Sequence, residues 1–239
     1  MEKNKANKFT SPKELADIQN EKAEIDVMAG ISNFNIIFTG YKFAIILTLA
    51  IFVSTQKTRG VHMSRLVKAA QNNMKIKNIE EVLINIQKEV SMTQSNCKII
   101  ANFKYPYNDQ FLDVEVILDN RGQFYYKFGI IGITSCPCSK AITGIGHMQR
   151  TKLKMEICRK EYVDFNNISE NMITSFSAKL EEFMNRADEA NKIIEAQNNS
   201  KFVEDVIRDC LKKFPDAEFI EAKSYESIHS HEAIAYWKK

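Results

Sequence analysis

The sequence contains no apolar stretch long enough to cross a lipid bilayer as a helix. The longest apolar run covers residues 43–53, whereas a membrane-spanning helix needs roughly 20 residues. Large apolar side chains alternate along much of this run, so we interpret it as a buried β-strand and expect no membrane partner. The first 22 residues are rich in Lys, Asn, Glu and Gln and lack the apolar core of a secretory signal. We therefore expect a cytoplasmic protein.

Cysteine and net charge are also low. The chain of 239 residues has five cysteines, an odd number without the spacing of a disulfide framework, which is typical of a reducing compartment. Its formal net charge is only +3, whereas nucleic-acid-binding proteins usually have a larger basic excess or a concentrated basic patch. We therefore expect no nucleic-acid partner. Cys136 and Cys138 are too close for an easy mutual disulfide, and we interpret them as metal-binding or reactive thiols.

Hydrophobic periodicity predicts two rounds of strands followed by helices, and hence an α+β fold. The first round has two strands within residues 35–55, a helix capped by Ser64, a helix around 82–90 and a strand at 97–103.

The second round begins with strands, of which the first two are joined by a turn at residues 119–122. One helix is expected to start with a capping box at residues 167–170 and to continue through Phe183, and another to cover residues 203–214. The last predicted strand runs from Tyr225 to Trp237.

The four histidines of the chain all lie in three short polar segments, at residues 59–65, 134–150 and 225–232. In the second segment Cys136 follows a strand and His147 follows a glycine-rich loop. Thiolate and imidazole are preferred ligands of zinc and related divalent ions, so a folded-back loop would create a metal site. A buried free thiol beside a hydrogen-bonded histidine is the alternative.

The other two segments also allow two interpretations each. On the predicted last strand, His229 and His231 share one face, which suits metal binding or acid–base catalysis, but a polar strand edge has the same pattern. Residues 59–65 lie at a predicted helix N-terminus, where backbone N–H groups and arginines favour phosphate, but an ordinary capped helix fits too. Glu204 and Asp205 by themselves are most simply solvated acids.

Five motifs together resemble the GTP cyclohydrolase type IB family, which includes the archaeal GTP cyclohydrolase of methanopterin synthesis. They occur in the family's order and cover roughly residues 55–235. The motifs are Arg-Gly-Val-His-Met-Ser-Arg at 59–65, Cys-Pro-Cys-Ser at 136–139, His-Met-Gln-Arg at 147–150, Phe-Val-Glu-Asp at 202–205 and Glu-Ser-Ile-His-Ser-His at 226–231.

The resemblance implies tandem tunnelling-fold (T-fold) units, built from antiparallel sheets with paired helices on one face. It also implies a homotetramer with active sites between subunits. We divide the chain into a flexible N-terminal arm (residues 1–30), a first, abbreviated unit (31–105) and a second unit (106–239). The first unit is called abbreviated because the stretch before Arg59 is shorter than is usual in the family.

The resemblance further implies one divalent metal ion per subunit, Fe²⁺ or alternatively Zn²⁺ or Mn²⁺, bound by Cys136, His147 and Glu189. Glu204 matches the acid that anchors guanine. The catalytic candidates are Cys136, Glu226, His229 and His231. The candidates for binding the triphosphate and ribose of GTP are Arg59, His62, Ser64, Arg65, Lys140 and Arg150.

The implied reaction is metal-dependent hydrolytic opening of the imidazole ring of GTP, with release of formate. The product is 7,8-dihydroneopterin 2′,3′-cyclic phosphate in the archaeal branch or 7,8-dihydroneopterin triphosphate in the bacterial branch, as the first step of methanopterin or folate biosynthesis. The alternative is a non-catalytic metal- or nucleotide-binding protein with the same fold. A zinc-dependent nucleobase deaminase is disfavoured, because its H-x-E and P-C-x-x-C signature is absent from the sequence.

Overall fold

A computed structural model describes residues 17–239, so the first 16 residues of the predicted arm (1–30) lie outside the described part of the chain. After a short 3-10 helix (Ile18–Asn20), the first half contains β1 (Met28–Phe38), β2 (Ile45–Ser54), α1 (Met63–Asn72), α2 (Ile79–Ser91), β3 (Ser95–Tyr107) and β4 (Gln110–Leu118). The second half contains β5 (Phe124–Ser135), α3 (Pro137–Thr143), β6 (Met148–Arg159), α4 (Phe165–Ile173), β7 (Ala178–Lys179), α5 (Arg186–Asn198), α6 (Val203–Lys213), β8 (Ala217–Ser224) and β9 (Ala233–Lys238).

The strands form one antiparallel sheet in the order β1-β2-β3-β4-β5-β6-β8-β9, with the two-residue β7 paired to β5. The pairing brings apolar residues of successive strands side by side, as in Ile51 beside Ile99 and Ile99 beside Leu118. Because side chains alternate between the two faces of a strand, this register gathers the apolar positions on one face of the sheet.

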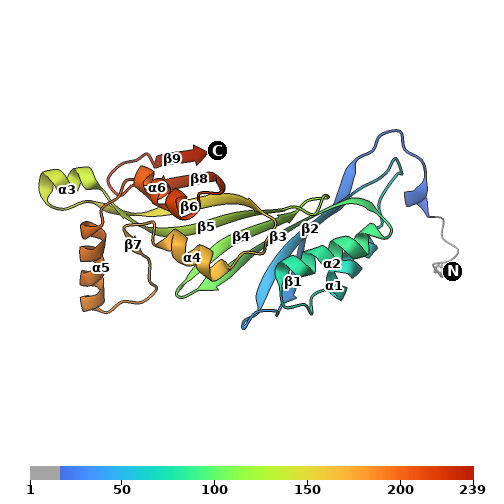
Figure 1. The fold of residues 1–239 in the computed structure, drawn as a ribbon, viewed down its shortest axis with the longest axis horizontal. Coiled ribbons are helices and arrows are strands. Elements are labelled where there is room, and N and C mark those ends of the chain that lie inside the picture. The colour runs from blue at the N-terminus through green and yellow to red at the C-terminus, as the bar shows by residue number, and fades with distance from the viewer. Residues whose placement is uncertain (1–16) are drawn as a thin grey trace, which may run out of the picture.

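The helices that complete the core pack on this apolar face (Figure 1). α1 and α2 lie against the part of the sheet formed by β1 and β3, whereas α4 and α6 lie against β5, β6 and β8. The predicted α+β class, with an antiparallel sheet and helices on one face, is therefore confirmed. Among the described residues, no helix has the length and apolarity that crossing a membrane would require.

Each half of the sheet has the same element order, two strands, two core helices and two strands, once α3, β7 and α5 are set aside. The predicted boundary between residues 105 and 106 falls inside β3, whose hairpin partner is β4. The turn at residues 119–122, where Gly122 has a positive φ of 81°, lies between the two halves. We propose that turn as the division between the units.

Residues 17–27 lie along the segment that follows β2. The backbone N–H of Arg59 donates a 2.7 Å hydrogen bond to the carbonyl of Glu21. The Asp26 carboxylate accepts hydrogen bonds from the hydroxyl groups of Ser54 and Thr55. These contacts connect the second part of the predicted arm to the loop that leads into α1.

The predicted helix through Phe183 is wrong. The helix is α4, which starts after Asp164, whose carboxylate accepts hydrogen bonds from two backbone N–H groups of the first turn, and it ends at Ile173. Phe176 keeps the expected burial, but it does so on an extended segment that turns back to pair with β5. The periodicity wrongly indicated a longer helix, because Phe176 packs against the sheet and follows the apolar residues of α4 at a spacing that a helix also allows.

Four further features differ from the sequence prediction. α3 and α5 were missed because both helices are largely exposed and have little apolar periodicity. The predicted strand at 225–237 is confirmed for residues 233–237, which belong to β9, but is wrong for residues 225–232, which form the loop between β8 and β9. Ser64 is not the N-cap of α1: His62 has that position, and Ser64 lies exposed in the first turn.

Two glycines of β5 offer a test of the packing between β7 and the sheet. A Cβ atom on Gly132 would lie 2.2 Å from the ring of buried Phe176, whereas one on Gly129 would be 3.3 Å from the flexible end of Lys152. We expect Gly132→Ala to lower the free energy of unfolding by about 1–3 kcal/mol through overpacking. Gly129→Ala is the matched control, and urea unfolding of both variants is the measurement. Equal stability of the two variants would contradict this packing.

Candidate functional site

A pocket of about 390 Å³ lies at the end of the sheet where β5 and β8 end and β6, β9 and α6 begin. Its lining combines one thiol, three imidazoles, two carboxylates and one lysine with neutral polar and apolar side chains. The residues that line it are Thr134, Cys136, His147, Gln149, Lys201, Phe202, Val203, Glu204, Ser224, Glu226, His229, His231, Ala233 and Ile234.

Cys136 and His147 come together because α3 and its flanking turns connect two neighbouring strands. The backbone N–H of Cys136 donates a 2.9 Å hydrogen bond to the carbonyl of His147, next to the last β5–β6 pair, Ser135 and Met148. The Ser139 hydroxyl accepts a 3.1 Å hydrogen bond from the His147 backbone N–H. The two ends of the glycine-rich loop are therefore held side by side, as we predicted for a loop that folds back.

The imidazole of His147 is largely enclosed, with 16% of its side chain exposed. Its Nδ1 atom lies 2.9 Å from Oε1 of Gln149 and 3.8 Å from Oε2 of Glu226. Gln149 Nε2 in turn donates to the Thr134 hydroxyl at 3.3 Å. Since Nδ1 faces these groups, the ring orientation is determined by β6 neighbours and by the loop after β8.

The loop between β8 and β9 brings three polar side chains to the pocket. Glu226, with only 8% of its side chain exposed, accepts a 2.8 Å hydrogen bond from the Ser224 hydroxyl. The rings of His229 and His231 stack with centroids 5.0 Å apart, and the His229 ring lies edge-on to His147 with centroids 6.2 Å apart. The two histidines are neighbours as predicted, but a loop and not a strand places them.

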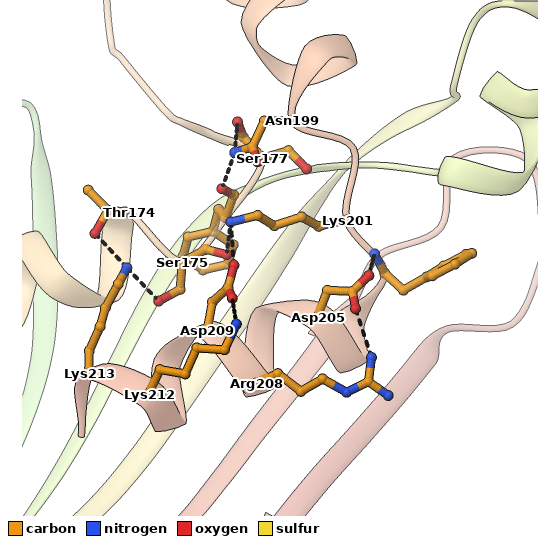
Figure 2. Close-up of polar contacts among 12 residues, drawn as sticks. Thr174, Ser175, Ser177, Asn199, Lys201, Asp205, Arg208, Asp209, Lys212 and Lys213 are labelled. Atoms are coloured by element: carbon orange, nitrogen blue, oxygen red, sulfur yellow. Dashed lines mark hydrogen bonds and ion pairs between the residues drawn. The ribbon is translucent and has the colours of Figure 1, made fainter. Parts of the chain in front are cut away.

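Glu204 enters the pocket from the first turn of α6, where its carboxylate is exposed. The start of this helix is set by Asp205, which accepts a 3.1 Å hydrogen bond from the backbone N–H of Phe202 and pairs with Arg208 at 2.7 Å (Figure 2). Asp205 therefore has a structural partner, while the neighbouring Glu204 faces the pocket.

Lys201 attaches this helix start to the rest of the molecule. Its backbone N–H donates to the carbonyl of Ser135, the residue before Cys136, at 3.0 Å. Its ammonium group lies between the carbonyl of Ser175 at 3.0 Å and the carboxylate of Asp209 at 2.9 Å, as Figure 2 shows. Burial favours a raised pKa for Asp209, but hydrogen bonds from Lys201 and Lys212 outweigh it and hold the pKa below its usual value. The ion pair therefore persists at neutral pH.

Several predicted site residues do not reach this pocket within one chain. Glu189 lies exposed on the first turn of α5, and Lys140 donates a hydrogen bond to the carbonyl of Gln197. Arg150 is exposed on β6 outside the pocket lining. The remaining four, Arg59, His62, Ser64 and Arg65, lie at the start of α1 under the opposite half of the sheet (Figure 1).

The pocket has the donor types of a divalent-metal site. Thiolate, imidazole and carboxylate groups together suit Zn²⁺, Fe²⁺ or Mn²⁺, and Cys136 and His147 are held on adjacent backbone segments. Within residues 17–239, however, no three His, Cys, Asp or Glu side chains are already grouped as metal ligands. The chemistry of the donor set fits a metal ion, and side-chain rotation or a second chain would have to complete its coordination.

A larger hollow, of about 790 Å³, lies on the face of the sheet that the helices leave open. Its charged side chains are paired: Asp113 contacts Lys104 at 3.1 Å and Lys152 at 3.0 Å, and Glu115 contacts Lys127 at 2.9 Å. Lys154 contacts Glu221, outside the hollow, at 2.8 Å. Because these charges already have partners, the smaller pocket with its thiol and imidazoles is the better candidate for catalysis.

The chain is similar in sequence to GTP cyclohydrolases. A family model described as Type I GTP cyclohydrolase folE2 matches residues 15–235. GTP cyclohydrolase FolE2 of Fervidobacterium nodosum is 34% identical over 211 residues, which cover 80% of this chain and 81% of the relative. GTP cyclohydrolase MptA of Picrophilus torridus is 26% identical over 255 residues, which cover 93% of each chain.

Among solved structures, the uricase of Arthrobacter globiformis resembles the chain with a TM-score of 0.50. The likeness covers 91% of this chain and 95% of the uricase at 9% sequence identity, so it concerns the fold alone. It confirms the predicted tunnelling fold.

Proposed function

Because the chain belongs to the type I GTP cyclohydrolase folE2 family, we propose that the pocket around Cys136 and His147 is its active site. The protein is a GTP cyclohydrolase, acting in the first step of folate or methanopterin biosynthesis. The observation that carries the assignment is the convergence of four chain segments, which supply Cys136, His147, Glu204 and the polar loop 226–231 to one pocket.

We assign the binding of the guanine ring to Glu204. A carboxylate accepts hydrogen bonds only, and its two oxygens match the two N–H donors on the edge of a guanine ring. Its place at the start of α6 also lets the helix N-terminus stabilise the negative charge of the carboxylate. The ring would then lie across the pocket toward His147 and His229.

The loop after β8 supplies groups that transfer protons. Imidazole titrates near neutral pH, and His229 and His231 are exposed at the pocket while Glu226 is held close to His147. Water adds to C8 of guanine, and one of the two histidines delivers a proton to the ring nitrogen that leaves as the imidazole ring opens; hydrolysis of the remaining C8–N bond by a second water then releases formate. Glu226 and Gln149 keep the His147 ring in one orientation.

One divalent ion per subunit would be held by Cys136 and His147, with Fe²⁺ as first choice and Zn²⁺ or Mn²⁺ as alternatives. When bound, such an ion supplies Lewis acidity, which lowers the pKa of water toward neutrality. Glu189 would complete the ligands only if α5 moved or another subunit supplied it, because it lies about 12 Å along the helix from Gln197, the α5 residue that contacts the loop before His147.

A second copy of the chain would complete the substrate site. Arg59 lies in the loop before α1, His62 is its N-cap, and Ser64 and Arg65 lie in its first turn; a helix N-terminus with arginines favours phosphate groups. α1 and α3, the helix next to the pocket, lie at opposite ends of the sheet (Figure 1), so we propose that these residues bind the triphosphate of GTP in the pocket of a neighbouring subunit of a homotetramer. Exposed apolar side chains on or beside α3 and α5 support an interface: Ile142, Ile145, Phe183 and Ile194 are each more than half exposed.

Product analysis tests this proposal. Metal-free protein is incubated with GTP without oxygen, adding Fe(II), Mn(II) or Zn(II) separately, and the products are identified by mass spectrometry. We expect formate and a dihydroneopterin phosphate, whose cyclic phosphate or triphosphate form assigns the product. No consumption of GTP with any of the metals would instead support a metal- or nucleotide-binding protein without turnover.

A further inference from the structure

The last turn of α5 contacts the loop that carries His147. The side-chain amide of Gln197 makes two hydrogen bonds with the backbone of Gly146, the residue before His147. Gly146 N–H donates to Oε1 of Gln197 at 2.8 Å, and Nε2 of Gln197 donates to the Gly146 carbonyl at 2.8 Å. A two-point contact of this kind restrains both the position and the rotation of the peptide unit.

Gly146 is confined on its other side as well. A Cβ atom at this position would lie 2.4 Å from Oγ of Ser135 and 2.6 Å from the carbonyl oxygen of Cys136. The backbone of Gly146 is therefore packed between the junction of β5 and α3, where Ser135 and Cys136 lie, and the amide of Gln197. A shift of Gly146 would move His147 relative to Cys136.

Gln197 is itself held in place by hydrogen bonds to its backbone carbonyl. Its carbonyl accepts hydrogen bonds from the ammonium group of Lys140 and, at 2.7 Å, from the hydroxyl of Ser200. Most of α5 is exposed, and Ala196, the residue before Gln197, is its buried residue. α5 is thus attached to the pocket through its C-terminal turn.

We propose that Gln197 is a positioning residue, which sets the distance of His147 from Cys136 through Gly146; this rests on the proposed role of the pocket. Gln197 does not line the pocket, so it acts on the ligands and not on the substrate. Outer partners that orient metal ligands typically change metal affinity or activity by about 10–100-fold when they are replaced.

Two variants isolate the contact. Gln197→Glu has nearly the same shape and can still accept from Gly146 N–H, but it cannot donate to the carbonyl, and two oxygens would face each other. Gln197→Met removes both hydrogen bonds without adding charge. Asn198→Asp is the matched control, because it introduces the same charge at an exposed neighbouring residue.

The measurements are Mn(II) affinity, from the loss of the free-ion EPR signal during titration, and hydrogen exchange of the metal-free protein. We expect both Gln197 variants to bind Mn(II) about 10–100-fold more weakly. The peptide that contains Gly146 should exchange faster, and the Kd for GTP should change less than twofold. Asn198→Asp should behave as wild type.

Unchanged Mn(II) affinity and exchange in both Gln197 variants would overturn the proposal. So would an equal loss of affinity in Asn198→Asp, since charge alone would then explain the effect. If the wild-type protein neither bound Mn(II) nor consumed GTP, the proposed function would fail, and unchanged or faster exchange at Gly146 in the variants would still decide whether Gln197 holds this loop.

Discussion

Replacing His147 with alanine is expected to abolish retention of the divalent ion and to lower kcat for GTP by a factor on the order of 10³ or more. The imidazole is one of two donors that the β5–α3–β6 connection holds together, so its loss leaves Cys136 as the single preorganised ligand. Without the ion, water near neutral pH is a poor nucleophile, and the reaction loses several kcal/mol of stabilisation, at about 1.4 kcal/mol per factor of ten.

The measurement is metal content by mass spectrometry after dialysis, combined with formate release at saturating GTP. Met148→Ala is the control, since Met148 is the adjacent residue but does not line the pocket. The cooperative unfolding of His147→Ala should stay close to that of wild type, because the ring lines the pocket and is not part of the apolar core. If His147→Ala kept its metal and full turnover, the assignment of this residue as a ligand would be wrong.

Replacing Glu204 with glutamine is expected to weaken GTP binding by about 10–100-fold and to leave the metal content unchanged. The glutamine keeps one acceptor but turns an amide donor toward a guanine N–H donor, so one hydrogen bond is lost and two donors face each other. A charge-assisted hydrogen bond contributes about 1.5–3 kcal/mol, which corresponds to this loss of affinity.

Binding is best measured by titration calorimetry with GTP, and the metal by the same dialysis procedure. Glu218→Gln is the matched control, because it removes the same charge from an exposed residue of β8 outside the pocket. GTP affinity that is equal in Glu204→Gln and wild type would exclude Glu204 as the guanine anchor. A simultaneous loss of metal would instead indicate that Glu204 is part of the ion's coordination.

The features that the sequence by itself determined most fully are the apolar face of the sheet and the helices that cover this face. Alternation in residues 112–118 predicts β4, and the apolar stripe of residues 203–214 predicts α6, because burial on one side imposes a period of 2 or 3.6. The motifs also identified Cys136 and His147 as candidates, since they stand at the two ends of a loop between adjacent strands. Both inferences depend on information that is local in the chain.

Only the tertiary structure decided how distant segments share the pocket. His229 and His231 approach His147 through a loop whose polar composition has no periodicity, so the predicted strand was wrong there. α5 buries too little surface to be recognised by pattern, yet its Gln197 holds Gly146 from 51 residues away. α1 and α3, the helix that follows Cys136, lie at opposite ends of one sheet, as Figure 1 shows. Such placements follow from the packing of whole elements. This packing depends on contacts between residues remote in sequence, which produce no periodic pattern along the chain.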